Sequence, residues 1–226
     1  MATVFFTGFP GFLGSELLPR VLVRSAKQRA VCIVQEKFAD LARKRVEELT
    51  ERQCELRDRI ELVTGDITEP DLGLGGERQR LAGETTEIFH LAAVYDLSVR
   101  RPVGMKVNVD GTRQVLDFAG QCPRLGRFQY VSTCFVRGRW AGIFGEDDLE
   151  RGQSFNNCYE ETKYLAEVEV QERMRQGLPT TIYRPAIVVG DSRTGATQKF
   201  DGPYFVIRWI MRLPWIAVVP VVGDPT

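Results

Sequence analysis

The stretch that decides the fold is Thr7-Gly8-Phe9-Pro10-Gly11-Phe12-Leu13-Gly14, a T-G-x-x-G-x-x-G pattern near the amino terminus. It follows a short apolar run, Thr3–Thr7, and opens a segment with helical spacing of apolar residues, Phe12–Arg24. Glycines let a backbone turn tightly beside a diphosphate, and the start of a helix favours a negative charge. In this strand, turn and helix context, the pattern predicts that these loop residues bind a dinucleotide.

Five further apolar runs follow along the chain, separated by segments with helical spacing. The expected strands are Thr3–Thr7, Ala30–Gln35, Ile60–Thr64, Glu87–Leu91, Phe128–Ser132 and Thr180–Arg184. The expected helices are Phe12–Arg24, Phe38–Arg57, Asn108–Cys122 and Asn156–Gln176, with a weaker one in Leu72–Gly83. This alternation predicts an α/β fold, a Rossmann-like doubly wound parallel sheet with helices on both faces.

Composition narrows the class of protein. The chain has 226 residues, 43% of them hydrophobic, and 30 basic residues balance 30 acidic ones, so we expect no nucleic-acid partner. The single histidine, His90, argues against a metal site and a Ser-His-Asp triad, and it is expected to be a core side chain. The most apolar segment, Tyr204–Val222, is interrupted by arginines and prolines. With no visible signal peptide and five scattered cysteines, we expect a cytoplasmic protein outside the membrane.

Three further segments are candidates for the cofactor pocket. After the second strand, Gln35-Glu36-Lys37 supplies an acidic group that favours NAD, whereas Lys37 and the later Arg43 favour NADP. Asp66-Ile67, after the third strand, either binds and covers an adenine or caps a turn. The small residues of Leu91-Ala92-Ala93 let a ribose lie against the backbone after the fourth strand. We expect NADP, with NAD open.

The candidate catalytic group combines a tyrosine and a lysine. Tyr159 and Lys163 are four residues apart on an expected helix and therefore project from one face. A nearby ammonium lowers the pKa of a phenol, which allows proton transfer to a carbonyl oxygen. Thr133, at the end of the fifth strand, offers a hydroxyl to the same oxygen.

These motifs, in this order, resemble the extended short-chain dehydrogenase/reductases. The matching residues are the glycine loop, Gly65-Asp66, Leu91-Ala92-Ala93, Asn108-x-x-Gly111-Thr112, Val131-Ser132-Thr133, Tyr159-x-x-x-Lys163 and Tyr183-Arg184-Pro185. Within that superfamily the glycine loop and the Tyr159–Lys163 segment are similar to the thioester-reductase and fatty-acyl reductase branch.

The resemblance implies catalytic roles for Thr133, Tyr159 and Lys163, with Asn108 either structural or a proton relay. It places Pro185 near the nicotinamide. It also implies reduction of a carbonyl or acyl thioester, with a possible homodimer through the Asn108–Cys122 and Asn156–Gln176 helices. The alternatives are a sugar-nucleotide epimerase or dehydratase that retains its NAD, and a cofactor-binding protein without turnover.

The resemblance also divides the chain. Residues 1–190 are expected to form the NAD(P)-binding domain with the catalytic residues. Residues 191–226 are expected to begin a smaller substrate-binding region that is incomplete, because family members continue further. Tyr204–Leu213 is expected to be a helix, either at the entrance of that region or packed on the core.

Overall fold

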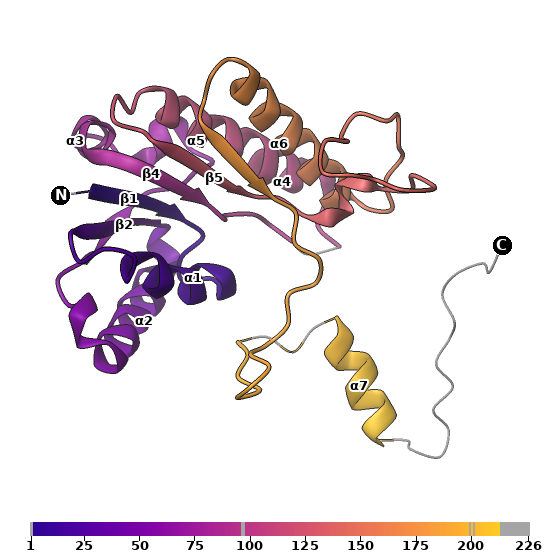
Figure 1. Cartoon of the computed structure of the whole chain (residues 1–226), viewed down its shortest axis with the longest axis horizontal. Helices are drawn as coiled ribbons and strands as arrows, with labels where there is room; N and C mark the ends of the chain where they lie inside the picture. Colours follow the sequence, from indigo (N-terminus) through magenta and orange to yellow (C-terminus); the bar gives the residue numbers. More distant parts are fainter. Residues whose placement is uncertain (1, 96–97, 199, 201, 213–226) are drawn as a thin grey trace. The chain divides into compact units, whose positions relative to one another are not determined.

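The computed structural model describes residues 2–95, 98–198, 200 and 202–212. The chain forms two compact units, Met1–Ala186 and Ile187–Thr226 (Figure 1). All strands and all candidate catalytic and cofactor-binding residues belong to the first unit.

The first unit is built on one six-stranded parallel sheet. Its strands are β1 (Ala2–Thr7), β2 (Gln28–Val34), β3 (Ile60–Thr64), β4 (Thr85–His90), β5 (Arg127–Val131) and β6 (Thr180–Tyr183). They lie in the order β3-β2-β1-β4-β5-β6, and every neighbouring pair is parallel. This is the order of a Rossmann fold, so the predicted fold class and all six predicted strands are confirmed.

Helices cover both faces of this sheet (Figure 1). One face carries α1 (Phe12–Leu22) and α2 (Ala39–Arg52), and the other carries α3 (Glu77–Glu84), α5 (Gly111–Gly120) and α6 (Cys158–Arg175). A short α4 (Arg101–Gly104) and a π-helical segment, η4 (Met105–Asp110), lead into α5. Crossover connections between parallel strands produce this layering.

The core consists of two apolar clusters, one on each face. Within β1, Val4 and Phe6 pack toward α1, whereas Phe5 between them packs toward α5. This alternation is the period-two pattern of a strand buried on both faces. It places Thr3 and Thr7, two residues either side of Phe5, on the α5 face at opposite ends of the strand.

The glycine loop connects β1 to α1 with little free space. Gly8 has a φ of +87°, and a Cβ there would lie 2.8 Å from the backbone nitrogen of Ala92. A Cβ at Gly14 would lie 2.6 Å from the carbonyl oxygen of Gly8. Both positions therefore require glycine, for the turn and for the close packing of α1.

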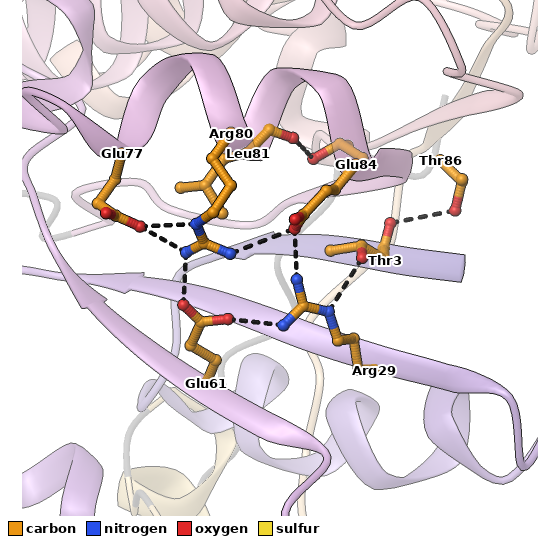
Figure 2. Close-up of polar contacts among 9 residues, drawn as sticks. Thr3, Arg29, Glu61, Glu77, Arg80, Leu81, Glu84 and Thr86 are labelled. Atoms are coloured by element: carbon orange, nitrogen blue, oxygen red, sulfur yellow. Dashed lines mark hydrogen bonds and ion pairs between the residues drawn. The ribbon is translucent and has the colours of Figure 1, made fainter. Parts of the chain in front are cut away.

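At the amino ends of the strands, on the α5 face, α3 is attached to the sheet by ion pairs (Figure 2). We name these residues the amino-end cluster: Arg29, Glu61, Glu77, Arg80 and Glu84. Arg29 of β2 binds both Glu61 of β3 and Glu84 of α3, and its Nε donates to the Thr3 hydroxyl at 3.2 Å. These side chains remain between a quarter and about half exposed.

The second unit contains α7 (Pro203–Arg212). The predicted helix is confirmed over these residues, while Leu213 and the rest of 213–226 lie outside the described residues. Within this unit the Tyr204 hydroxyl accepts a hydrogen bond of 2.7 Å from the Gly190 amide. Among the described helices, none is both long enough and apolar enough to cross a membrane. The assignment of this unit to a substrate region stays a prediction.

Candidate active site

The three candidate catalytic residues meet at the carboxyl end of β5. Thr133 follows β5 by two residues, is 4% exposed, and caps a short 3-10 helix, η5 (Cys134–Arg137), by accepting from the Phe135 amide. Its side chain is hydrogen-bonded to Tyr159, in the first turn of α6. The structure therefore brings the strand-end hydroxyl and the helical phenol together.

The start of α6 is fixed by capping hydrogen bonds. The Asn157 side chain accepts from the Glu160 amide at 2.9 Å, and the Glu160 carboxylate accepts in return from the Asn156 amide at 2.9 Å. Such reciprocal bonds satisfy donors that the first helical turn leaves unpaired. They hold the turn that carries Tyr159.

Lys163 lies one turn further along α6 and is 4% exposed. Its Nζ donates to the Val131 carbonyl at 2.8 Å and to the Tyr130 hydroxyl at 3.1 Å, and it lies 4.6 Å from the centre of the Tyr130 ring. Two of the three ammonium donors are thus used at the end of β5.

Burial dominates the electrostatics of this pair. It raises the pKa of Tyr159, against the opposing effect of the hydrogen bond with Thr133. It lowers the pKa of Lys163 to about 8, although the Glu167 charge raises it. The expectation that the pKa of Tyr159 is lowered is therefore wrong for this structure. Burial destabilises the phenolate more than the neighbouring groups stabilise it.

Asn108 lies in η4 and is 1% exposed. Its side-chain amide accepts from the Val94 amide at 2.8 Å and donates to the Val94 carbonyl at 2.9 Å and to the Thr162 hydroxyl at 3.0 Å. These bonds connect the segment after β4 to α6. They favour the structural alternative for Asn108, and a proton relay stays a prediction.

The predicted cofactor side of the site comprises the glycine loop and the segment after β4. The Thr7 hydroxyl accepts from the amides of Leu91 and Ala92, both at 3.1 Å. Ala93 continues this segment. Pro185 follows β6, and its carbonyl accepts at 3.1 Å from the amide of Cys134, which follows the neighbouring strand β5. All of these residues lie at the carboxyl ends of the strands, where open α/β sheets bind ligands.

The predicted ribose and adenine residues meet at the ends of β2 and β3. The Gln35 amide donates to the Asp66 carboxylate at 2.7 Å, and the Thr64 hydroxyl donates to Glu36 at 3.3 Å. Burial alone would raise the pKa of Asp66, but hydrogen bonds from Thr68 and Gln35, with the charge of Lys37, lower it overall.

The remaining candidates of this pocket have other neighbours. Lys37 lies over the Phe38 ring at 5.0 Å, and Arg43 is paired with Asp40 on the exposed face of α2. Ile67 is 7% exposed and belongs to the core on the α5 face, where a Cβ at Gly111 would lie 2.8 Å from its Cδ1. Packing is therefore the observed role of Ile67, and its contact with an adenine stays a prediction.

Sequence reasoning missed two polar groups behind the site. The Glu167 carboxylate, fully buried, accepts from the Ser132 hydroxyl and pairs with Arg184 at 2.6 Å. Arg184 also donates to the backbone carbonyls of Gly145 and Asp148, and so holds the loop between β5 and α6. The second group surrounds His90, which is 1% exposed and lies between Thr7 and Thr112, so its prediction as a core residue is confirmed.

A doubly wound sheet with a glycine loop and the predicted Thr-Tyr-Lys group is typical of the short-chain dehydrogenase/reductases. The chain belongs to the NAD-binding family described as male sterility protein, whose model matches residues 6–219. The predicted resemblance is therefore confirmed.

Three proteins illustrate this likeness. The crystal structure of the terminal R domain from the myxalamid PKS-NRPS biosynthetic pathway is 36% identical, with a TM-score of 0.81, over 94% of this chain and 56% of that one. The non-canonical nonribosomal peptide synthetase cpsA of Aspergillus campestris is 29% identical over 96% of this chain and 22% of its own length. Fatty acyl-CoA reductase wat of Drosophila melanogaster is 25% identical over 89% of this chain and 46% of its own. The chain thus spans less than half of either curated relative.

Proposed function

We propose that this chain forms the cofactor-binding and catalytic part of a reductase that acts on the carbonyl group of an acyl thioester. The observation that carries this proposal is the contact between Thr133 and Tyr159 at the carboxyl end of β5, beside the buried Lys163 amine. It lies at the same edge of the sheet as the glycine loop. The names of the relatives, an R domain and a fatty acyl-CoA reductase, support this substrate class.

The chain's own residues would divide the acid-base work. Tyr159, whose pKa is raised by burial, remains protonated at neutral pH and donates its proton to the carbonyl oxygen. Thr133 holds that oxygen through its hydroxyl. Lys163 stabilises the developing phenolate and directs its third N–H donor, beyond its bonds to Tyr130 and Val131, toward the cofactor ribose.

The glycine loop fits a dinucleotide because it leads directly into the amino end of α1, which favours the negative charge of a diphosphate. Gly8 and Gly14 let the loop pack closely against the Leu91–Ala92 backbone and against α1. When bound, a reduced nicotinamide dinucleotide supplies the hydride. The loop and the Leu91–Ala93 segment would hold its diphosphate and ribose, and Pro185 would lie near the nicotinamide.

NADP is the proposed cofactor, with NAD as the second candidate. The residue that follows β2, Gln35, has a neutral side chain that is hydrogen-bonded to Asp66, and the basic residues Lys37 and Arg43 come after it. Glu36 favours NAD. Titration of the protein with NADPH and NADH, followed by nucleotide fluorescence, tests this choice. We expect tighter NADPH binding, and Glu36→Gln should increase the preference for NADPH over NADH if Glu36 lies at the ribose.

We also propose a cytoplasmic protein that forms homodimers through the outer faces of α5 and α6. Five free cysteines suit a reducing compartment. The outer faces of the two helices carry exposed ion pairs, Arg113–Glu169 and Asp117–Arg173. Light scattering after size-exclusion chromatography tests the homodimer.

The decisive test of the reaction is Tyr159→Phe. We expect the variant to bind NADPH with the wild-type Kd while kcat for an acyl-coenzyme A thioester falls by about 10²–10⁴, because the general acid is lost. Tyr164→Phe, one turn away on the same helix with its ring against Phe155, is the matched control and should retain kcat. Unchanged turnover in Tyr159→Phe would exclude this mechanism.

The pH dependence follows from Lys163. Its ammonium form predominates below its pKa of about 8 and is lost above it, so kcat should fall as pH rises through about 8. A rate that stays level to about pH 9.5, more than one unit above that pKa, would contradict a role for the charged amine.

Two other outcomes would favour the alternative functions. Tightly retained NAD in the purified protein would favour an epimerase or dehydratase, whereas nucleotide binding without turnover would favour a regulatory protein.

A further inference from the structure

A row of polar side chains crosses the sheet beneath the site. In the parallel register Thr7 of β1 lies beside His90 of β4, and His90 lies beside Tyr130 of β5. All three point to the α5 face, where Thr112 of α5 and Lys163 of α6 complete the row. We name these five residues the buried polar chain. None of the five is more than 4% exposed.

The hydrogen bonds of the first half allow one assignment of protons. The Thr7 oxygen accepts from two amides, so its own proton goes to His90 Nδ1 at 2.7 Å. Burial and the Lys163 charge lower the pKa of His90 to about 3, so the ring is neutral. The remaining ring proton is then on Nε2, which donates to the Thr112 hydroxyl at 2.9 Å.

The second half follows from Thr112. Its hydroxyl proton goes to the Asn108 carbonyl at 2.6 Å, so toward its other neighbours Thr112 only accepts. Burial raises the pKa of Tyr130, and the neighbouring Thr112 hydroxyl partly opposes this effect. The Tyr130 oxygen accepts from the Lys163 ammonium at 3.1 Å. The protons of Thr7, His90 and Thr112 therefore each have one direction.

We propose that Tyr130 is a positioning residue for Lys163, whose amine it fixes through its hydroxyl and its ring, packed against His90 of the buried polar chain. The chain reaches the glycine loop through Thr7, which immediately precedes Gly8 and binds the segment after β4. It therefore couples the position of the lysine to the loops that hold the cofactor. This inference rests on the proposed function, since Tyr130 positions an amine that takes part in the proposed reaction.

The groups around the Lys163 amine decide what loss of the hydroxyl does. They are Tyr130 from β5, His90 from β4, and Glu167 on α6, which is itself paired with Arg184. Tyr130→Phe keeps the ring against the amine and removes an acceptor that favours the ammonium. Lys163 should then lose its proton at a lower pH than in the wild type.

The test uses the whole 226-residue chain with carbon-13 at the lysine side chains. The chain has six lysines, so the Lys163 signal can be assigned with Lys163→Arg and titrated by NMR. In Tyr130→Phe we expect a lower midpoint for Lys163 and a fall in kcat of roughly 10- to 100-fold, with NADPH affinity retained. Tyr183→Phe, which removes a hydroxyl bonded to Gln129 on the neighbouring strand, is the matched control and should change neither.

A second pair of variants tests the chain if Tyr130→Phe does not fold. Thr112→Val removes the hydroxyl that accepts from His90 and neighbours Tyr130, and Thr112→Ser retains it. We expect the valine variant to reproduce the shifted midpoint and the lower kcat, and the serine variant to restore both. The single histidine gives one set of nitrogen-15 signals, which should show a proton on Nε2 in the wild type.

The opposite results are equally specific. A wild-type Lys163 midpoint in both Tyr130→Phe and Thr112→Val overturns the proposal, and so does a shifted midpoint with wild-type kcat. The NMR readout requires no turnover. If the wild type lacks reductase activity but Lys163 still responds to Tyr130→Phe, the proposed function fails while the contact itself stands.

Discussion

One face of the sheet holds polar side chains at both ends of its strands, in two different ways. At the carboxyl ends the buried polar chain contains one amine and otherwise neutral groups, and its members lie out of contact with water. At the amino ends the amino-end cluster contains two arginines and three carboxylates that remain partly exposed (Figure 2). Thr7 of β1 belongs to the buried polar chain, and Thr3 of the same strand accepts a hydrogen bond from Arg29 of the amino-end cluster.

The difference shows what each arrangement can do. Buried hydrogen bonds are costly to break, because a donor or acceptor left without its partner remains out of water. They therefore fix positions, as a site requires. Partly exposed ion pairs exchange with water and salt, so they attach α3 to the sheet at a modest gain in stability.

The largest expected effect is at His90. His90→Leu removes both ring nitrogens, so the Thr7 hydroxyl proton loses its acceptor and the Thr112 oxygen loses a donor, both out of water. The free energy of unfolding should therefore fall by about 2–4 kcal/mol. Urea unfolding followed by circular dichroism measures this. A smaller loss of unfolding free energy in His90→Leu than in Glu61→Gln, the variant of the amino-end cluster, would contradict this difference between the two groups.

Acid should expose the same difference. Because the pKa of His90 is about 3 in the folded protein and about 6.5 when unfolded, the unfolded state binds the extra proton between these values. Stability should therefore decline as pH falls below about 6.5, by about 3 kcal/mol at about pH 4.5. His90→Leu should lack this component, so the difference between the two unfolding curves isolates it from the carboxylates. Parallel curves would show that His90 is protonated in the folded state.

The smallest effect is expected in the amino-end cluster. Glu61→Gln removes the carboxylate that joins Arg29 to Arg80, and the free energy of unfolding should fall by about 1 kcal/mol or less. The loss should shrink further in about 1 M salt, where screening is strong, whereas the loss in His90→Leu should not. A salt-independent loss above about 2 kcal/mol would show that these pairs act as buried ones.

Several features followed from the sequence because they depend on local pattern. The six apolar runs gave the strands, since a strand buried on both faces must be apolar along its length. The glycine pattern predicted the turn between β1 and α1, because the backbone of this turn leaves no room for a Cβ at Gly8. The spacing of Tyr159 and Lys163 gave two residues on one helical face.

Only the tertiary structure decided how these residues are surrounded. The sequence placed Lys163 as a partner of Tyr159, but the fold also brings its amine to Tyr130 and Val131. The raised pKa of Tyr159 likewise depends on burial by segments distant along the chain. The parallel register aligned Thr7, His90 and Tyr130, because it matches strands that are far apart in sequence. Local pattern carries no information about such distances in space, so the sequence determined which groups are present and the fold determined which of them meet.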